Sequence, residues 1–179
     1  MLRKSNNETL IIPLVIFSLI RFLPLPINVT PISAIALFAG TYILDKKKAT
    51  YFVMALVLFG DVILGLLKFE EFGLYKLGLY LTLILVVRLG ILLRGREQRQ
   101  TIMVASLVGS ILFFFLANFT AWLFSNQGEI NWQGLGEFYV EAIPYVKGTM
   151  MGDLLFNTLL FGGYSLTKWI KGSFMTNEN

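Results

Sequence analysis

Long apolar runs separated by short polar stretches dominate the chain. A membrane-spanning helix needs about 20 apolar residues, with a working range of roughly 17–25. Four runs meet this length, whereas the first two are shorter and predict helices that are tilted, buried or locally broken. The pattern therefore predicts six transmembrane helices, at about 9–24, 31–45, 49–68, 73–93, 101–125 and 149–170.

Composition supports a membrane protein. Hydrophobic residues make up 56% of the 179 residues and charged residues only 15%, and the mean hydropathy is +0.70. A soluble domain carries about 25% charged residues. We therefore expect one all-α integral membrane domain over residues 1–179. The net charge of +4 does not indicate nucleic-acid binding, because the basic residues lie between apolar segments and do not cluster on a polar surface.

The basic residues also predict an orientation. With the N-terminus inside, each inner segment is rich in Lys or Arg, as the positive-inside rule requires for six spans with both termini in the cytoplasm. The longest connection, 126–148, then lies outside, and its aromatic residues predict an interfacial helix or a lid over the bundle mouth. The inner basic residues are Arg3, Lys4, Lys46, Lys47, Lys48, Arg94, Arg96, Arg99, Lys168 and Lys171.

The chain contains no cysteine and no histidine. This excludes disulfides, thiolate nucleophiles, Cys/His zinc sites and triads built on a His or Cys base. The remaining carboxylates, amides, hydroxyls, amines and aromatic rings are better suited to binding than to bond-breaking. We expect neither a catalytic motif nor a metal or other cofactor.

Four charged residues lie inside the apolar runs: Arg21, Asp61, Arg88 and Asp153. Placing a charge in hydrocarbon costs from roughly 2.5 to more than 10 kcal/mol. Such a charge therefore persists only when it is paired with another group, hydrated, or required for function. The two arginines are long enough to snorkel to an interface, Arg88 more readily than Arg21. Asp61 is too short to do so and needs a partner or a cavity. Asp153 begins the predicted sixth helix, where the helix dipole is an alternative reason for a carboxylate.

With the predicted orientation, polar residues from several helices share the outer half of the bundle. This convergence predicts an outward-facing polar cavity that binds a small molecule between aromatic walls. For Trp122, membership of the interfacial aromatic belt is the alternative. The predicted ligand-binding residues are Arg21, Asn28, Asp61, Tyr80, Asn118, Trp122, Tyr145, Asp153 and Asn157.

Small residues form a second pattern. Ala36 and Gly40 lie four residues apart, Gly60 and Gly65 flank Asp61, and Gly162–Gly163 interrupt the predicted sixth helix. Small residues let helix backbones approach closely. Close packing inside the bundle is the favoured interpretation, and a docking face for another membrane subunit is the alternative.

Several segments resemble an uncharacterised bacterial membrane family whose members are described as similar to the substrate-binding S components of energy-coupling factor (ECF) transporters. The resemblance covers nearly the whole chain. The first segment reads RFLPLPINVTPISAIALFAG. The matching segments are 21–40, 61–65, 113–122, 142–144 and 149–154.

The resemblance implies a six-helix, S-component-like bundle in the bacterial inner membrane that captures a vitamin or a similar small molecule near its outer face. It also implies a coupling subunit and ATPases as partners. Single-component cobalamin uptake proteins are similar in general type, but this chain has no Cys or His to ligate cobalt.

Two other functions stay open from the sequence. In a structural accessory subunit, Arg21 would form a bundle-locking ion pair with Asp61 or Asp153. In a membrane enzyme, Asp61 and Asp153 would act as an acid–base carboxylate pair, which requires that they approach closely.

Overall fold

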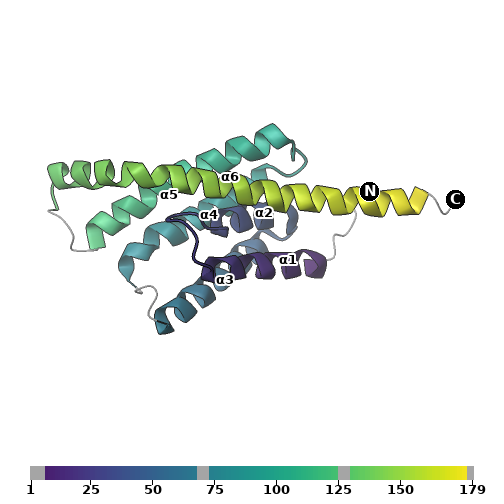
Figure 1. Ribbon diagram of the computed structural model, residues 1–179, viewed down its shortest axis with the longest axis horizontal. Coiled ribbons are helices and arrows are strands. Elements are labelled where there is room, and N and C mark those ends of the chain that lie inside the picture. The colour runs from purple at the N-terminus through teal and green to yellow at the C-terminus, as the bar shows by residue number, and fades with distance from the viewer. Residues whose placement is uncertain (1–6, 68–72, 125–129, 177–179) are drawn as a thin grey trace.

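The computed structural model describes residues 7–67, 73–124 and 130–176, and within these ranges the chain is helical, with no strand (Figure 1). Six α-helices and two 3-10 turns follow one another. Their bounds are α1 Asn7–Leu19, η1 Ile20–Phe22, α2 Ile32–Tyr42, α3 Lys46–Leu66, η2 Leu74–Lys76, α4 Leu77–Leu92, α5 Arg99–Phe124 and α6 Trp132–Thr176.

The six predicted helices are present, but six full-length spans were too many. Within the described ranges, three helices are long and apolar enough to cross a membrane: Lys46–Leu66, Leu74–Leu92 and Arg99–Phe124. The first two apolar helices, Leu10–Phe22 and Ile32–Tyr42, are shorter, as the lengths of their apolar runs predicted. The structure therefore supports a helical protein that associates with a membrane.

Helix α6 differs most from its predicted form. It begins at Trp132, so residues 132–148, predicted as part of the outer connection 126–148, are its first turns. Residues 125–129 lie outside the described ranges. The helix also continues through Pro144 and through Gly162–Gly163, where the sequence predicted an interruption. Asp153 therefore lies in the middle of a helix, and the helix-dipole explanation for its charge is wrong.

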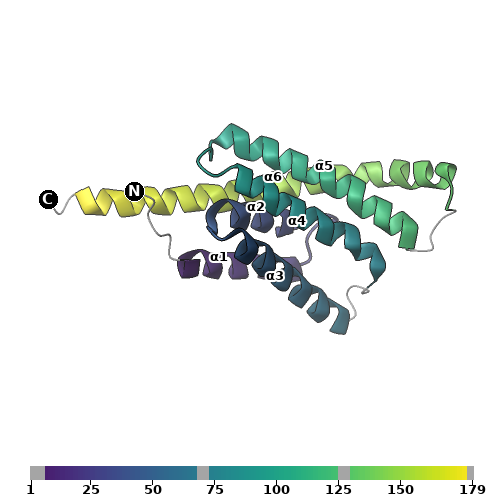
Figure 2. The ribbon, with the colours of Figure 1, turned by 180° about the vertical axis from the view of Figure 1, so that it is seen from behind.

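Successive helices alternate in direction along the bundle. Figures 1 and 2 show that α1, α3 and α5 run one way and α2, α4 and α6 run back. The beginning of α1 and the end of α6 consequently lie toward the same end, together with the α2–α3 and α4–α5 connections. We call this end the basic end, because Lys46–Lys48 and Arg94–Arg99 lie there.

The short helix α2 forms the centre of the core, with nine of its eleven residues buried. Its most extensive contact is with α4. At Gly40 and at Gly90, a Cβ atom would collide with the backbone of the facing helix, at the carbonyl oxygens of Val87 and Leu37 respectively. The favoured interpretation of Gly40, close packing inside the bundle, is thus confirmed.

Arg94 closes the basic end of the α2–α4 contact. Its guanidinium donates to the carbonyl oxygens of Gly40 (2.9 and 3.0 Å), Ile43 (2.7 Å) and Leu44 (2.9 Å). These carbonyls lie at or just beyond the end of α2, where the carbonyl oxygens have no N–H donor within the helix. One planar side chain therefore caps α2 and ties it to the end of α4.

Candidate functional site

A cavity of about 350 Å³ opens between the other ends of α4, α5 and α6. It lies opposite the basic end. The wall is mainly apolar, and polar groups enter from η2, α5, α6 and the segment that carries Asn28. The lining residues are Asn28, Tyr75, Lys76, Leu79, Phe113, Phe114, Ala117, Asn118, Ala121, Ala142, Tyr145, Val146 and Thr149.

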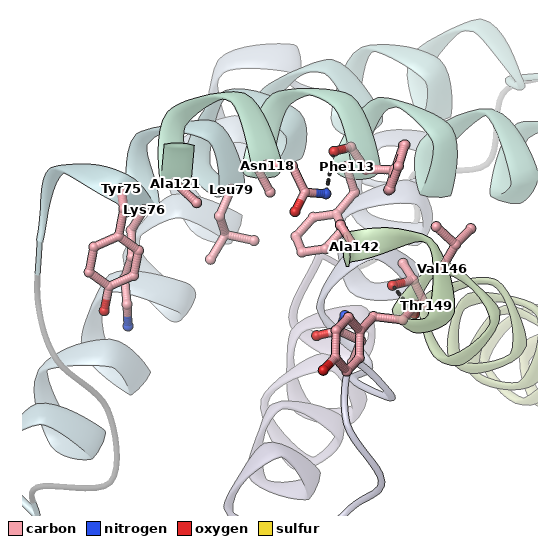
Figure 3. Close-up of a pocket in the computed structure, with 13 residues that line it drawn as sticks. Tyr75, Lys76, Leu79, Phe113, Asn118, Ala121, Ala142, Val146 and Thr149 are labelled. Carbon is pink, nitrogen blue, oxygen red and sulfur yellow. Dashed lines mark hydrogen bonds between the residues drawn. The ribbon is translucent and has the colours of Figure 1, made fainter. Parts of the chain in front are cut away.

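Figure 3 shows how the elements share this wall. Tyr75 and Lys76 come from η2, and Val146 and Thr149 face them from α6. Asn118 on α5 lies between these two sides; its Nδ2 donates to the Phe114 carbonyl oxygen at 2.7 Å. An amide whose donor is held by its own helix keeps its carbonyl oxygen for another partner.

The walls of the cavity are fixed by backbone contacts. The Thr120 hydroxyl of α5 donates to the Tyr75 carbonyl oxygen at 2.8 Å, which holds η2 against α5. On the opposite side, Asn28 adopts a left-handed conformation with φ of +61°, which Asn tolerates better than most residues. A Cβ on Gly148 would lie 2.5 Å from the Ile27 carbonyl oxygen. The absence of that atom lets α6 touch this segment.

Beside the cavity, Asp61 is the centre of a buried charged cluster. Its Oδ1 forms ion pairs with Arg21 and, at 3.7 Å, with Lys76 Nζ. The Tyr80 hydroxyl donates to Asp61 Oδ2 at 2.7 Å. Only 7% of the Arg21 side chain is exposed, so Arg21 does not snorkel. The predicted need of Asp61 for a partner is confirmed.

Gly60 makes this cluster possible, because a Cβ there would lie 2.9 Å from the Arg21 guanidinium. Arg21 also donates to the Val57 carbonyl oxygen at 3.4 Å. The cluster therefore joins η1, α3, η2 and α4. It contains the Arg21–Asp61 pair that the structural hypothesis requires.

A second polar cluster lies between α5 and α6. The Ser110 hydroxyl donates to Asp153 Oδ2 at 2.6 Å, and Asn157 Nδ2 donates to the Ser106 hydroxyl oxygen at 2.9 Å. A side-chain hydrogen bond also links Ser33 of α2 to Asp153. All of these groups except Ser33 are fully buried.

The two buried carboxylates thus have different partners, Asp61 among cations and a phenol, Asp153 among serine hydroxyls. The enzyme hypothesis requires a close approach of Asp61 and Asp153, and no such contact is found among the described residues. Residues 7–67, 73–124 and 130–176 also contain no group of three or more acidic, His or Cys side chains that could hold a metal ion.

The nine predicted ligand-binding residues therefore fall into separate places. Asn28, Asn118 and Tyr145 line the cavity. Arg21, Asp61 and Tyr80 form the charged cluster, and Asp153 and Asn157 belong to the second polar cluster. Trp122 does not line the cavity and instead packs against Phe119, with ring centroids 5.8 Å apart. Arg88 is exposed, as its predicted snorkelling requires.

Sequence reasoning missed Lys76, which both lines the cavity and pairs with Asp61. Ser106 and Ser110 were missed because single serines in an apolar run carry no signal alone. The signal was their spacing: four residues apart, they match the spacing of Asp153 and Asn157.

The comparisons with known proteins give a family but no activity. No curated protein matches the chain, and no solved structure matches it either. A family model, described as "Family of unknown function (DUF6580)", matches residues 3–173. Since that match covers almost the entire sequence, the chain belongs to the DUF6580 family.

Proposed function

We propose that this protein captures a small molecule in the cavity between α4, α5 and α6, as the substrate-binding component of a membrane transport system. By the positive-inside rule the cavity faces outward, because it lies opposite the basic end. The resemblance to ECF S components suggests a vitamin-like ligand and a coupling subunit with ATPases in the bacterial inner membrane.

The observation that carries the proposal is the cavity itself. Small-molecule sites are concave and mostly apolar, occupy about 300–1,000 Å³, and contain a few placed polar groups. Here about 350 Å³ is enclosed by apolar walls such as Leu79 and Phe113. Lys76, Asn118 and Tyr145 supply a cation, an amide and a phenol from three different elements. Such groups fix the orientation of a ligand.

Native mass spectrometry of the detergent-extracted protein tests the proposal. The wild-type chain is expected to retain a small molecule. Ala117→Phe, which places a ring in the cavity, is expected to lose it. Ala55→Phe is the matched control, because Ala55 is an exposed position of α3. A wild-type protein without bound mass, or equal retention in Ala117→Phe, would contradict the proposal.

One observation favours a second function, that of a structural subunit of a larger membrane complex. The Arg21–Asp61–Lys76–Tyr80 cluster joins several helical elements by ion pairs and a hydrogen bond. Holding helices together in this way requires no ligand. The Ala117→Phe variant separates the two functions. A purely structural subunit would keep its partner subunits in this variant, and the wild-type protein would carry no small molecule.

A further inference from the structure

The α5–α6 interface contains a continuous row of facing positions. On α5 the row consists of every fourth residue from Ser106 to Asn118, and on α6 of every fourth residue from Tyr145 to Asn157. Because the helices are antiparallel, Asn118 corresponds to Tyr145 and Phe114 to Thr149. The next two pairs are hydrogen-bonded directly: Ser110 with Asp153 and Ser106 with Asn157.

The row connects the cavity to the buried polar cluster. Its first two pairs, Asn118 with Tyr145 and Phe114 with Thr149, line the cavity. Asp153 lies one helical turn deeper than Thr149. One turn beyond Asn157 is Phe161, which is buried against Phe38 with ring centroids 5.1 Å apart. The polar row is therefore continuous with the cavity at one end and closed by aromatic rings at the other.

Asp153 lacks the partner that a buried carboxylate requires. Only 3% of the residue is exposed, and its hydrogen bonds come from the neutral hydroxyls of Ser110 and Ser33. No ion pair in the described part of the chain involves Asp153. An isolated ionised carboxylate in an apolar interior is costly unless a positive charge compensates it. Asp61, with two cationic partners, shows the contrast.

Asn157 supplies an independent sign of a missing partner. It is 3% exposed, and its Oδ1 is a buried acceptor with no hydrogen bond among the described residues. Asn157 lies one turn from Asp153 on the same face of α6, so the two side chains are neighbours. Buried acceptors without a partner are rare and point to an unrecorded water or ion.

We propose that this cluster binds a monovalent cation, Na⁺, one helical turn beyond the cavity wall at Thr149. The Asp153 carboxylate and Asn157 Oδ1 are its principal ligands, with the Ser110 and Ser33 hydroxyl oxygens beside them. Hard cations prefer carboxylate, carbonyl and hydroxyl oxygen. One carboxylate matches one positive charge, whereas a divalent ion would leave a net charge in the bundle.

The serine hydroxyls can adapt to the ion without moving. Ser110 Oγ also lies 3.2 Å from the Ser106 carbonyl oxygen, so its hydrogen can turn to that acceptor. Rotation frees a lone pair of Ser110 Oγ for the cation, because a hydroxyl is one donor and two acceptors.

Equilibrium binding of ²²Na⁺ to the purified full-length protein in detergent tests this site without any organic ligand. We expect saturable binding of one ion per chain in wild type. Asp153→Asn keeps the shape and one acceptor oxygen for the Ser110 hydroxyl but removes the charge, and it should abolish binding. Asn157→Leu should weaken binding by about tenfold or more. Glu137→Gln, an exposed carboxylate on the same helix, should bind like wild type.

A second measurement keeps the test decisive if a variant folds poorly. Replacing choline chloride by NaCl at constant ionic strength should raise the Tm of wild type and of Glu137→Gln, but not that of Asp153→Asn. Absence of ²²Na⁺ binding in wild type would overturn the proposal. So would a Tm that responds to pH but not to Na⁺, because Asp153 would then be a protonated acid. Neither result depends on the proposed cavity ligand.

Discussion

The α2–α4 contact and the α5–α6 interface show two different ways of joining helices in one bundle. At the first, glycines bring the backbones together and Arg94 caps the end. At the second, the helices are held by side-chain hydrogen bonds and open into the cavity. The first contact is suited to holding the fold, and the second to binding.

The difference lies in what each contact tolerates. A backbone-to-backbone contact cannot adjust to a larger residue, whereas a cavity wall already has space beside it. The Asp61 cluster lies between these regions, since Lys76 lines the cavity and Tyr80 belongs to α4. Substitutions in the three places should therefore have graded effects on stability.

The largest effect is expected for Asp61→Ala. Removing the carboxylate takes away the ion pairs of two buried cations, which costs about 3 kcal/mol or more of unfolding free energy. Circular dichroism during SDS-induced unfolding measures the change. Replacing the pair by apolar residues, Arg21→Met with Asp61→Leu, should recover part of the loss. A loss below about 1 kcal/mol in Asp61→Ala would mean that the cluster is hydrated and does not lock the bundle.

Gly90→Ala should follow, with a loss of about 2–3 kcal/mol, because its Cβ meets the Leu37 carbonyl oxygen and the helices must separate. Gly162→Ala is the matched control, since a Cβ there meets no atom within 4 Å. It should be neutral or stabilising by about 0.5–1 kcal/mol, as expected for Gly→Ala inside a helix. Equal effects of the two substitutions would remove the distinction between the two helix contacts.

Arg94→Lys should cost about 1–2 kcal/mol. The charge remains, but a lysine has three donors on one nitrogen and cannot reproduce the four hydrogen bonds of the planar guanidinium. Arg96→Lys, an exposed neighbour, should leave the unfolding free energy unchanged. If the two variants behave alike, Arg94 contributes only its charge, and the cap of α2 is not needed.

The smallest effect on stability is expected for Ala117→Phe, within about 1 kcal/mol of wild type, because the new ring enters space that already exists. Its expected effect on ligand retention is nevertheless complete. A large loss of stability would show that the cavity wall is as tightly packed as the α2–α4 contact.

The sequence predicted those features that depend on one residue alone. Asp61 had to find a partner because its side chain is too short to reach an interface, and Gly40 indicated a close contact because it has no side chain. The number and order of the helices followed from the apolar runs. Which side chains contact Asp61 and Asp153 depends on the rotation of each helix about its axis, which an apolar sequence does not determine. The contacts of Lys76, Ser106 and Ser110 were therefore not predicted.

The length of α6 was missed for a different reason. Pro144 and Gly162–Gly163 normally end helices in water, where exposed backbone groups are readily hydrated. In this structure α6 nevertheless continues through all three residues. The apolar run alone therefore placed the start of α6 too late.

Helix α6 is a single continuous helix from Trp132 to Thr176. At 1.5 Å per residue, its 45 residues extend about 67 Å, more than the full thickness of a bilayer with its headgroups. Tyr145 of the cavity wall lies in the first third of the helix, and Trp169 lies near its far end, exposed beyond the core. Because the helix is continuous between these two residues, a tilt of α6 beside the cavity also displaces its exposed end.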